Sequence, residues 1–308
     1  MVAPLPLGSP APTSVRSAGA AHRFFRHPLA RLGGALLLLL LLGALGARGF
    51  SRAPHKFDFI FPNGLDSLGV PHAPGGGFLL GADTLGRDVW TRLLFGARLS
   101  LAIALCAMLT STLIGTLVGL VAGFFGGRTD RALTRLTEIV ASLPTILLAI
   151  TLTLVLPDSW RQIPFWKAFN LDPRLVLAIG LVTWTGISRT VRGQVLSLRE
   201  REFIEAARAL GMSNATILRR HILPNVLPSV ITLAALATAT NILLEAGLSY
   251  LGLNTPDAPS WGSMIAEGQP YFASAPWITL APGIAIVLAV VAFNLLGNAL
   301  TESLETRR

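Results

Sequence analysis

The stretch that decides the fold is residues 99–125, LSLAIALCAMLTSTLIGTLVGLVAGFF, where 27 consecutive positions carry no Asp, Glu, Lys or Arg. A helix rises 1.5 Å per residue, so about 20 apolar residues cross the roughly 30 Å hydrocarbon layer of a bilayer. This stretch exceeds that requirement. It therefore predicts a transmembrane helix, and the rest of the chain has to suit a lipid environment.

The composition of the whole chain agrees with a membrane protein. Of 308 residues, 52% are apolar and only 13% are charged, and the mean hydropathy is +0.61. A soluble domain carries about 25% charged residues, so this chain has too few charges to solvate a surface of its size. Disorder is excluded as well, because it requires low hydrophobicity. The single cysteine, Cys106, excludes a disulfide framework and a cysteine-based metal site.

Five further stretches resemble the first in lacking charged residues, apart from one glutamate. Together the six predict an all-α membrane protein with six transmembrane helices. Leu32–Ala47 and Leu175–Ile187 are short, and we expect flanking apolar residues and outward-reaching arginines to complete them. Leu32–Ala47 also resembles a secretory signal peptide, but five spans follow it, so an uncleaved anchor is favoured. The six stretches are Leu32–Ala47, Leu99–Phe125, Ile139–Leu156, Leu175–Ile187, Val226–Leu253 and Trp277–Leu300.

The distribution of basic residues predicts which side of the membrane each loop faces. With six spans, residues 1–31, 126–138, 189–225 and 298–308 share one side, which holds 16 Lys and Arg residues. The other side holds 9 over a similar length. The positive-inside rule therefore places both termini in the cytoplasm. We attribute the net charge of +9 to topology and contact with the lipid bilayer rather than to nucleic acid, because no aromatic residues are interleaved for base stacking.

This topology divides the chain into three parts. Residues 1–31 are a cytoplasmic N-terminal tail. Residues 32–97 hold the first transmembrane helix and an external segment. Residues 98–308 form a core with five transmembrane helices, and its longest cytoplasmic loop includes residues 199–224.

Glu245 is the single ionisable residue within the predicted spans. A charge near mid-membrane costs about 2.5–3.5 kcal/mol on insertion scales, so its presence requires a reason. It could line or gate a translocation path, or it could be a protonated or hydrogen-bonded structural side chain, and the sequence leaves both open. The chain has no GxxxxGK[ST] motif, no metal-ligand spacing among its five histidines and no nucleophile elbow, so we predict neither an enzyme nor a metal or cofactor site.

The loop at residues 199–224 reads REREFIEAARALGMSNATILRRHILP and predicts a helical hairpin. In its first helix, apolar positions recur at i, i+3, i+4 and i+7, so they share one face. Gly211 suits the end of that helix, and Ser213 can cap a second helix over residues 214–223, which Pro224 stops or kinks. The pattern alone slightly favours a helix on the membrane surface over one in a partner's groove. The predicted face consists of Phe203, Ala206, Ala207 and Leu210.

The order of residues in this loop resembles the EAA motif of ABC-importer permeases. That motif reads EAA, three residues, G, nine residues, and then I-x-L-P, and here EAARALG is followed by HILP. The isoleucine position holds His221 instead, so helix packing there cannot be carried over from the motif. RHILPN is similar to the version found in the peptide-type branch. The matching residues are Glu205, Ala206, Ala207, Gly211, Leu223 and Pro224.

Other stretches extend the resemblance over residues 22–305. GADTLGRDVWTRLLFGARLSL at 81–101 and LSYLGLNTPDAPSWGSMIAEGQPYF at 248–272 resemble the dipeptide, oligopeptide and nickel permeases. HPLARLGG before the first span resembles the N-terminal region of their C-type subunit. The resemblance implies a type I ABC-importer permease fold in a bacterial inner membrane.

The resemblance also implies a function and partners. The EAA hairpin would be a coupling helix docked in a cytoplasmic ABC ATPase, with Glu205 meeting the ATPase surface, small Ala206 and Ala207 permitting close approach, and Gly211 permitting the bend. ATP would be bound by separate ATPase subunits. A paralogous second permease and an external solute-binding protein would complete the importer. The substrate stays open among dipeptides, oligopeptides, nickel chelates and glutathione-like compounds.

Other interpretations remain beside this one. Glu205 could be a solvated charge paired with Arg201 or Arg208. The chain could be an integral-membrane enzyme or a proton-coupled secondary transporter that uses Glu245. Residues inside the spans that interrupt helices could be kink points for alternating access or ordinary packing positions, and these are Pro144, Gly180, Pro228, Pro282 and Gly283.

Overall fold

The computed structural model describes residues 22–52, 57–253 and 258–305, and in these the chain is helical with only isolated β-bridges. Most of the predicted N-terminal tail, residues 1–21, lies outside the described residues. The helices are α2 Pro28–Leu45, α3 Ala47–Phe50, α4 Val89–Phe125, α5 Gly127–Ser142, α6 Thr145–Val155, α7 Pro164–Ala168, α8 Pro173–Arg199, α9 Glu202–Ala209, α10 Asn214–Ile217, α11 Leu223–Tyr250, α12 Trp261–Gly268 and α13 Trp277–Glu305. Short turns of other helical types are Asp158–Gln162, Leu218–Ile222 and Gln269–Tyr271.

Four helical segments of the described chain are long and apolar enough to cross a membrane. They are Pro28–Leu45, Val89–Phe125, Asn214–Tyr250 and Trp277–Leu304. The pair α5 and α6 would make a fifth span, but it is bent by 97°. The third predicted stretch therefore forms a broken element. The fourth lies in α8, which has 27 residues but carries arginines in its second half.

The helix α4 begins ten residues before the apolar stretch that predicted it. Asp88 caps its N-terminus, because a carboxylate oxygen accepts a hydrogen bond from the Thr91 N–H at 2.8 Å. The predicted boundary between residues 97 and 98 consequently falls inside α4.

Close packing of α4 against α8 forms the centre of the molecule. Three glycines, Gly115, Gly119 and Gly123, recur every fourth residue on α4. A Cβ atom at Gly115 would lie 2.7 Å from the Trp184 carbonyl oxygen, and one at Gly119 would lie 2.7 Å from that of Ser188. Small residues at this spacing let two helix backbones approach closely in a membrane. The sequence of α4 thus brings α8 into the helical core.

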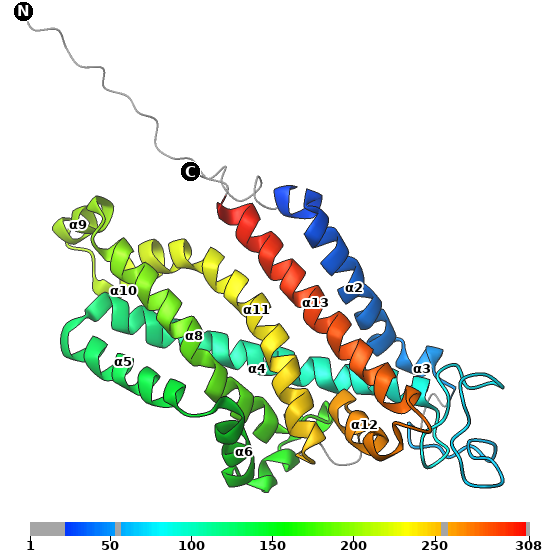
Figure 1. Cartoon of the computed structure of the whole chain (residues 1–308). Helices are drawn as coiled ribbons and strands as arrows, with labels where there is room; N and C mark the ends of the chain where they lie inside the picture. The colour runs from blue at the N-terminus through cyan, green and yellow to red at the C-terminus, as the bar shows by residue number, and fades with distance from the viewer. Residues whose placement is uncertain (1–21, 53–56, 254–257, 306–308) are drawn as a thin grey trace, which may run out of the picture.

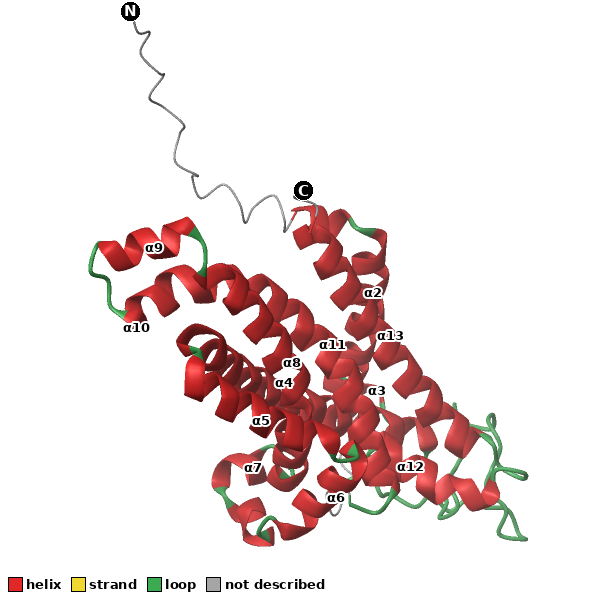
Figure 2. Cartoon of the chain, turned by 60° about the vertical axis from the view of Figure 1, so that its left-hand side comes forward, coloured by secondary structure: helices red, strands yellow, loops and turns green. Residues whose placement is uncertain are grey.

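The helices α11, α13 and α2 pack in succession beside α4 (Figure 1). The segment just before α2 meets the end of α13, where the Arg23 guanidinium donates to the Ser303 carbonyl oxygen at 3.1 Å. In both views α9 lies toward this same end of the molecule, and residues 57–88 lie at the opposite end (Figure 2). This end therefore holds the start of α2, the end of α13 and the predicted hairpin.

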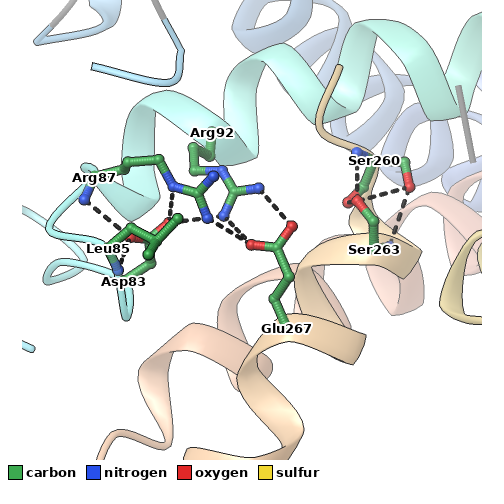
Figure 3. A network of polar contacts seen from close by, with 7 residues as sticks. All are labelled: Asp83, Leu85, Arg87, Arg92, Ser260, Ser263 and Glu267. Carbon is green, nitrogen blue, oxygen red and sulfur yellow. Dashed lines mark hydrogen bonds and ion pairs between the residues drawn. The ribbon is translucent and has the colours of Figure 1, made fainter. Parts of the chain in front are cut away.

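The opposite end is fastened by a network of charged side chains (Figure 3). Arg92 of α4 contacts Asp83 at 2.7 Å and Glu267 of α12 at 2.7 Å, and Arg87 contacts the same two carboxylates at 2.6 Å each. Burial alone would raise the pKa of Glu267, but hydrogen bonding to Arg92 and the charges of Arg92 and Arg87 hold that pKa below its usual range. The network fixes α12 and the 57–88 segment onto α4.

Candidate functional site

The first half of the hairpin is a short helix closed by a glycine, as the sequence predicts. α9 covers Glu202–Ala209, and Gly211 follows with a φ of 74°, which glycine adopts without steric cost. The Gly211 N–H donates to the Arg208 carbonyl oxygen at 2.9 Å, and the Met212 N–H donates to that of Ala207 at 3.1 Å. These two bonds form a Schellman motif, which fixes the angle at which the chain leaves α9.

The second half of the hairpin differs from the prediction. Ser213 does cap α10, since its hydroxyl oxygen accepts from the Thr216 N–H at 3.3 Å. The helix is not stopped at Pro224, however, because a π-helical turn at Leu218–Ile222 leads directly into α11. Residues 214–250 form one continuous membrane-length segment. The second half of the hairpin is thus one end of a long helical segment rather than a separate short helix.

The predicted apolar face of α9 is divided between the protein and the surface. Ala207 is only 4% exposed, but Phe203 is 44% and Leu210 79% exposed, and Ala206 is exposed too. Ile204, which the pattern did not include, is fully buried beside Ala207. Of the four residues of the predicted face, only Ala207 is buried, and the side of α9 that faces this chain is the i, i+3 pair Ile204 and Ala207. The other apolar side chains are left uncovered by this chain.

The buried side of the hairpin packs against the ends of three long helices, α4, α8 and α11. Ile204 and Ala207 pack with Ile217 of α10, Val195 of α8 and Phe124 of α4 in one apolar cluster. Fixed apolar contacts of this kind transmit displacement, since packed interiors are close to incompressible. A force on α9 would consequently reach α4, α8 and α11 together.

Glu205 lies on the uncovered side of α9. Its carboxylate makes no ion pair within the described residues, so neither Arg201 nor Arg208 holds it there. The Arg208 guanidinium instead lies 5.8 Å from the centre of the Phe124 ring. The exposed carboxylate stands beside exposed Phe203 and Leu210, a combination suited to contact with a partner protein.

The remaining motif residues lie on both sides of the π turn. Gly211 and Pro224 are exposed and Leu223 is partly buried. The Leu223 N–H donates to the Leu218 carbonyl oxygen, five residues back. His221, the residue that departs from the motif, is partly buried in this turn and its ring lies 6.3 Å from that of Phe203. All six motif residues therefore lie within the hairpin at residues 199–224.

Glu245 is placed away from the hairpin and inside the chain. Its side chain is fully buried on α11, and one carboxylate oxygen accepts from the Ser249 hydroxyl at 2.8 Å. The other oxygen has no hydrogen-bond partner in the described part of the chain. Nor do the described residues contain a group of three or more His, Cys, Asp and Glu side chains arranged for a metal ion.

Comparison with known sequences gives a consistent result. The sequence profile described as "Binding-protein-dependent transport system inner membrane component" matches residues 115–308. The chain is 34% identical over 287 residues to the oligopeptide transport system permease protein OppC of Bacillus subtilis (strain 168), covering 92% of this chain and 88% of that protein. It is 35% identical to the glutathione transport system permease protein GsiD of Shigella sonnei, covering 93% and 89%. It is 38% identical over 228 residues to the dipeptide transport system permease protein DppC of Alkalihalophilus pseudofirmus, covering 74% and 71%.

A solved structure shares the fold. The inward-facing MetNI methionine ABC transporter aligns with a TM-score of 0.52 at 21% identity, covering 69% of this chain and 96% of that chain. At this level of identity the likeness speaks for the helical arrangement alone.

Proposed function

Because the chain belongs to the family of inner membrane components of binding-protein-dependent transport systems, we propose that it is the permease subunit of an ATP-driven importer of peptides or related small solutes. The observation that carries this proposal is the hairpin at residues 199–224. It has the EAA order, a fixed glycine turn, and an exposed Glu205 that makes no ion pair with any described residue, on a helix packed against three long helices. The relatives named for oligopeptides, dipeptides and glutathione support substrates with a peptide backbone.

The proposal includes six spans. They would be α2, α4, the α5–α6 pair, α8, Asn214–Tyr250 and α13. At 1.5 Å per residue the 27 residues of α8 measure about 40 Å, which is long enough to cross a bilayer. An even number of spans fits the meeting of α2 and α13 at one end, and the excess of basic residues supports a cytoplasmic location for that end. The three-part division at residues 31 and 97 is kept as part of this proposal.

The proposal also includes the partner proteins that this chain would require for transport. A separate cytoplasmic ABC ATPase would bind ATP and receive α9 through Glu205, Phe203 and Leu210. A paralogous second permease would complete the translocation path, and an external solute-binding protein would deliver the substrate. The chain itself would act as a transport subunit and not as an enzyme.

The test compares substitutions within the hairpin. Glu205→Lys reverses the exposed charge, and we expect it to leave the protein inserted while lowering both co-purifying ATPase and uptake about tenfold or more. Glu202→Lys is the matched control, because Glu202 is also exposed on α9 but lies outside the motif. Equal ATPase recovery and uptake in Glu205→Lys and wild type, at equal membrane levels, would contradict the proposal.

Gly211 provides a second test that is independent of charge. Gly211→Val forces a β-branched residue into a left-handed conformation, whereas Gly211→Asn tolerates that conformation. No atom lies within 4 Å of a Cβ built at Gly211, so the backbone angle is the only obstacle. We expect coupling to be lost in the valine variant and retained in the asparagine variant.

Glu245 distinguishes this function from its alternatives. We propose that it acts on transport only through the packing of α11, since the chain encloses it completely. Glu245→Gln keeps the shape of the side chain and should preserve ATP-dependent uptake. Uptake that collapses with the proton gradient while ATP is maintained would favour a secondary transporter instead, which the comparisons do not support.

A further inference from the structure

Two adjoining hollows lie where α2, α4 and α13 reach the end of the molecule that carries α3 (Figure 1). The larger hollow has a volume of about 500 Å³, and its walls are almost entirely apolar. The smaller has a volume of about 390 Å³ and is lined in part by Ser51, Arg52 and Asp88. Phe50 and Trp90 line both hollows, so together they form one groove with an apolar part and a polar part.

The apolar part of the groove lies at one end of three membrane-length helices. Most of its walls come from the last turns of α2 and the first turns of α4 and α13. In the proposed topology this is the external end, where acyl chains meet lipid headgroups. Leu39, Leu42 and Ile284 line the apolar part and are each more than half exposed, so it opens to the surroundings of the chain.

In the polar part, the Arg52 guanidinium is held in place without being neutralised by the described residues. It lies 4.5 Å from the centre of the Phe61 ring and 4.3 Å from that of Phe78, and its Nη1 atom donates to the Gly77 carbonyl oxygen at 2.9 Å. No other atom of the described residues accepts from this guanidinium, and none of their carboxylates forms an ion pair with it. A fixed positive charge that keeps free donors suits an oxyanion such as phosphate.

Ser51 adds a second donor to the polar part. Its Oγ atom is buried and has no hydrogen-bond partner in the described part of the chain. Buried hydroxyl groups are normally paired, so a group from outside this chain is needed to complete its hydrogen bonding. Asp88, the acid in the same wall, is already engaged, because its carboxylate accepts from the Thr91 N–H at 2.8 Å and from the Thr91 hydroxyl at 2.6 Å.

We propose that this groove binds one phospholipid, with an acyl chain in the apolar part and the phosphate beside Arg52 and Ser51. The basic part adjoins the apolar part in the order in which a phospholipid joins its phosphate to its chains. A soluble anion would fill only the polar part, and a hydrocarbon chain alone would fill only the apolar part. Trp90 lies between the two, as amphipathic rings do at the level of the headgroups. The proposal uses the membrane topology of the proposed function, but no step of transport.

Native mass spectrometry of the intact, purified transporter tests the polar part. The complex is freed of co-purified lipid in detergent and titrated with palmitoyl-oleoyl-phosphatidylglycerol. We expect the wild type to hold one lipid per copy of this chain and Arg52→Gln to bind it at least about tenfold more weakly. Arg52→Lys keeps the charge and should recover part of the affinity. Arg48→Gln is the matched control, because Arg48 is exposed on α3 but does not line the groove.

A substitution that fills the apolar part tests the site of the acyl chain. Ala281→Phe places a ring in the apolar part, whereas Val287→Phe places one on the exposed surface of the same helix, outside the groove. We expect Ala281→Phe to weaken binding at least about tenfold and Val287→Phe to leave it unchanged. Thermal midpoint and ATP-dependent uptake are measured for each variant to establish that the complex stays assembled.

Each other result has a definite meaning. Equal weakening by Arg52→Gln and Arg48→Gln, or by Ala281→Phe and Val287→Phe, would overturn the proposal. Displacement of the lipid by an equal concentration of inorganic phosphate would overturn it too, since the anion alone would then account for binding. Lipid held by the isolated chain but not by the assembled transporter would mean that the second permease fills the groove, which also contradicts the proposal. Lipid binding by a complex without ATP-dependent uptake would instead contradict the proposed function and leave the lipid site in place.

Discussion

Two of the Leu-Pro pairs in this chain, Leu143-Pro144 and Leu223-Pro224, have opposite effects on their helices. At Leu143 and Pro144 the helix ends and the chain turns by 97°. At Leu223 and Pro224 the helix continues to Tyr250. Leu143 has extended backbone angles, φ −83° and ψ 140°, whereas Leu223 stays helical at φ −55° and ψ −45°. The residue before a proline normally avoids the helical region, so Leu223 is exceptional, as is Leu227 before Pro228 inside α11.

The surroundings of the two prolines explain the difference. Before Pro224 the π turn shifts the hydrogen-bond register, and the Asn225 amide donates to the His221 carbonyl oxygen at 2.6 Å. Ile222 and Val226 on either side are fully buried, which holds the helix in place. Pro144 has no such support, because residues 141–147 are exposed. Of these two prolines, the one at which the helix ends is the one that lacks both a nearby amide and buried neighbours.

The largest effect is expected from Pro144→Ala. Proline disfavours a helix interior by about 3 kcal/mol relative to alanine, so the substitution shifts the balance toward a straight α5–α6 helix. We expect uptake to fall at least about tenfold and the distance between spin labels at positions 135 and 154 to lengthen. Double electron–electron resonance in the Cys106→Ser background measures that distance.

Pro144→Gly is the matched control for this experiment. Glycine also disfavours a helix, by about 1 kcal/mol, so the bend and most of the uptake should persist. If both variants matched the wild type in uptake and in spin-label distance, the bend would not depend on proline. The proposed contrast between Pro144 and Pro224 would then be wrong.

A smaller effect is expected at the unbroken site. Asn225→Ala removes the hydrogen bond to the His221 carbonyl oxygen, which is worth about 1 kcal/mol at an exposed position. Asn225→Ser should recover part of the loss, because a serine hydroxyl can donate to the carbonyl four residues earlier. The midpoint of thermal unfolding of the purified complex reports both changes. If the midpoint fell equally in the Ala and Ser variants, the hydrogen bond to the His221 carbonyl oxygen would not be what stabilises the helix here.

The sequence predicted the general fold and the hairpin because both depend on local patterns. Charge-free runs marked the long helices, and the order of Glu205, Gly211 and Ser213 marked a helix, its end and the next cap. Local patterns could not predict that the helix ends at Pro144 but continues through Pro224. Both follow leucine in apolar sequence, and the outcome depends on burial, which is a tertiary property. The inward position of Ile204 was missed for the same reason, since Phe203 satisfies the helical period equally well.

The smallest effect is expected from His221→Ile, which introduces the residue that the EAA motif has at this position. The His221 Nε2 atom is buried without a hydrogen-bond partner among the described residues, so losing the imidazole forfeits no bond from that atom. A β-branched apolar side chain of similar size should fill the space beside Phe203 at a change of about 0.5 kcal/mol or less. Thermal midpoint, ATPase recovery and uptake should all remain within error of the wild type, while Asn225→Ala in the same preparation gives the scale for a real loss. A large fall in ATPase recovery for His221→Ile would mean that the imidazole itself maintains the π turn, and then the passage of the helix through Pro224 would depend on this departure from the motif rather than on Asn225.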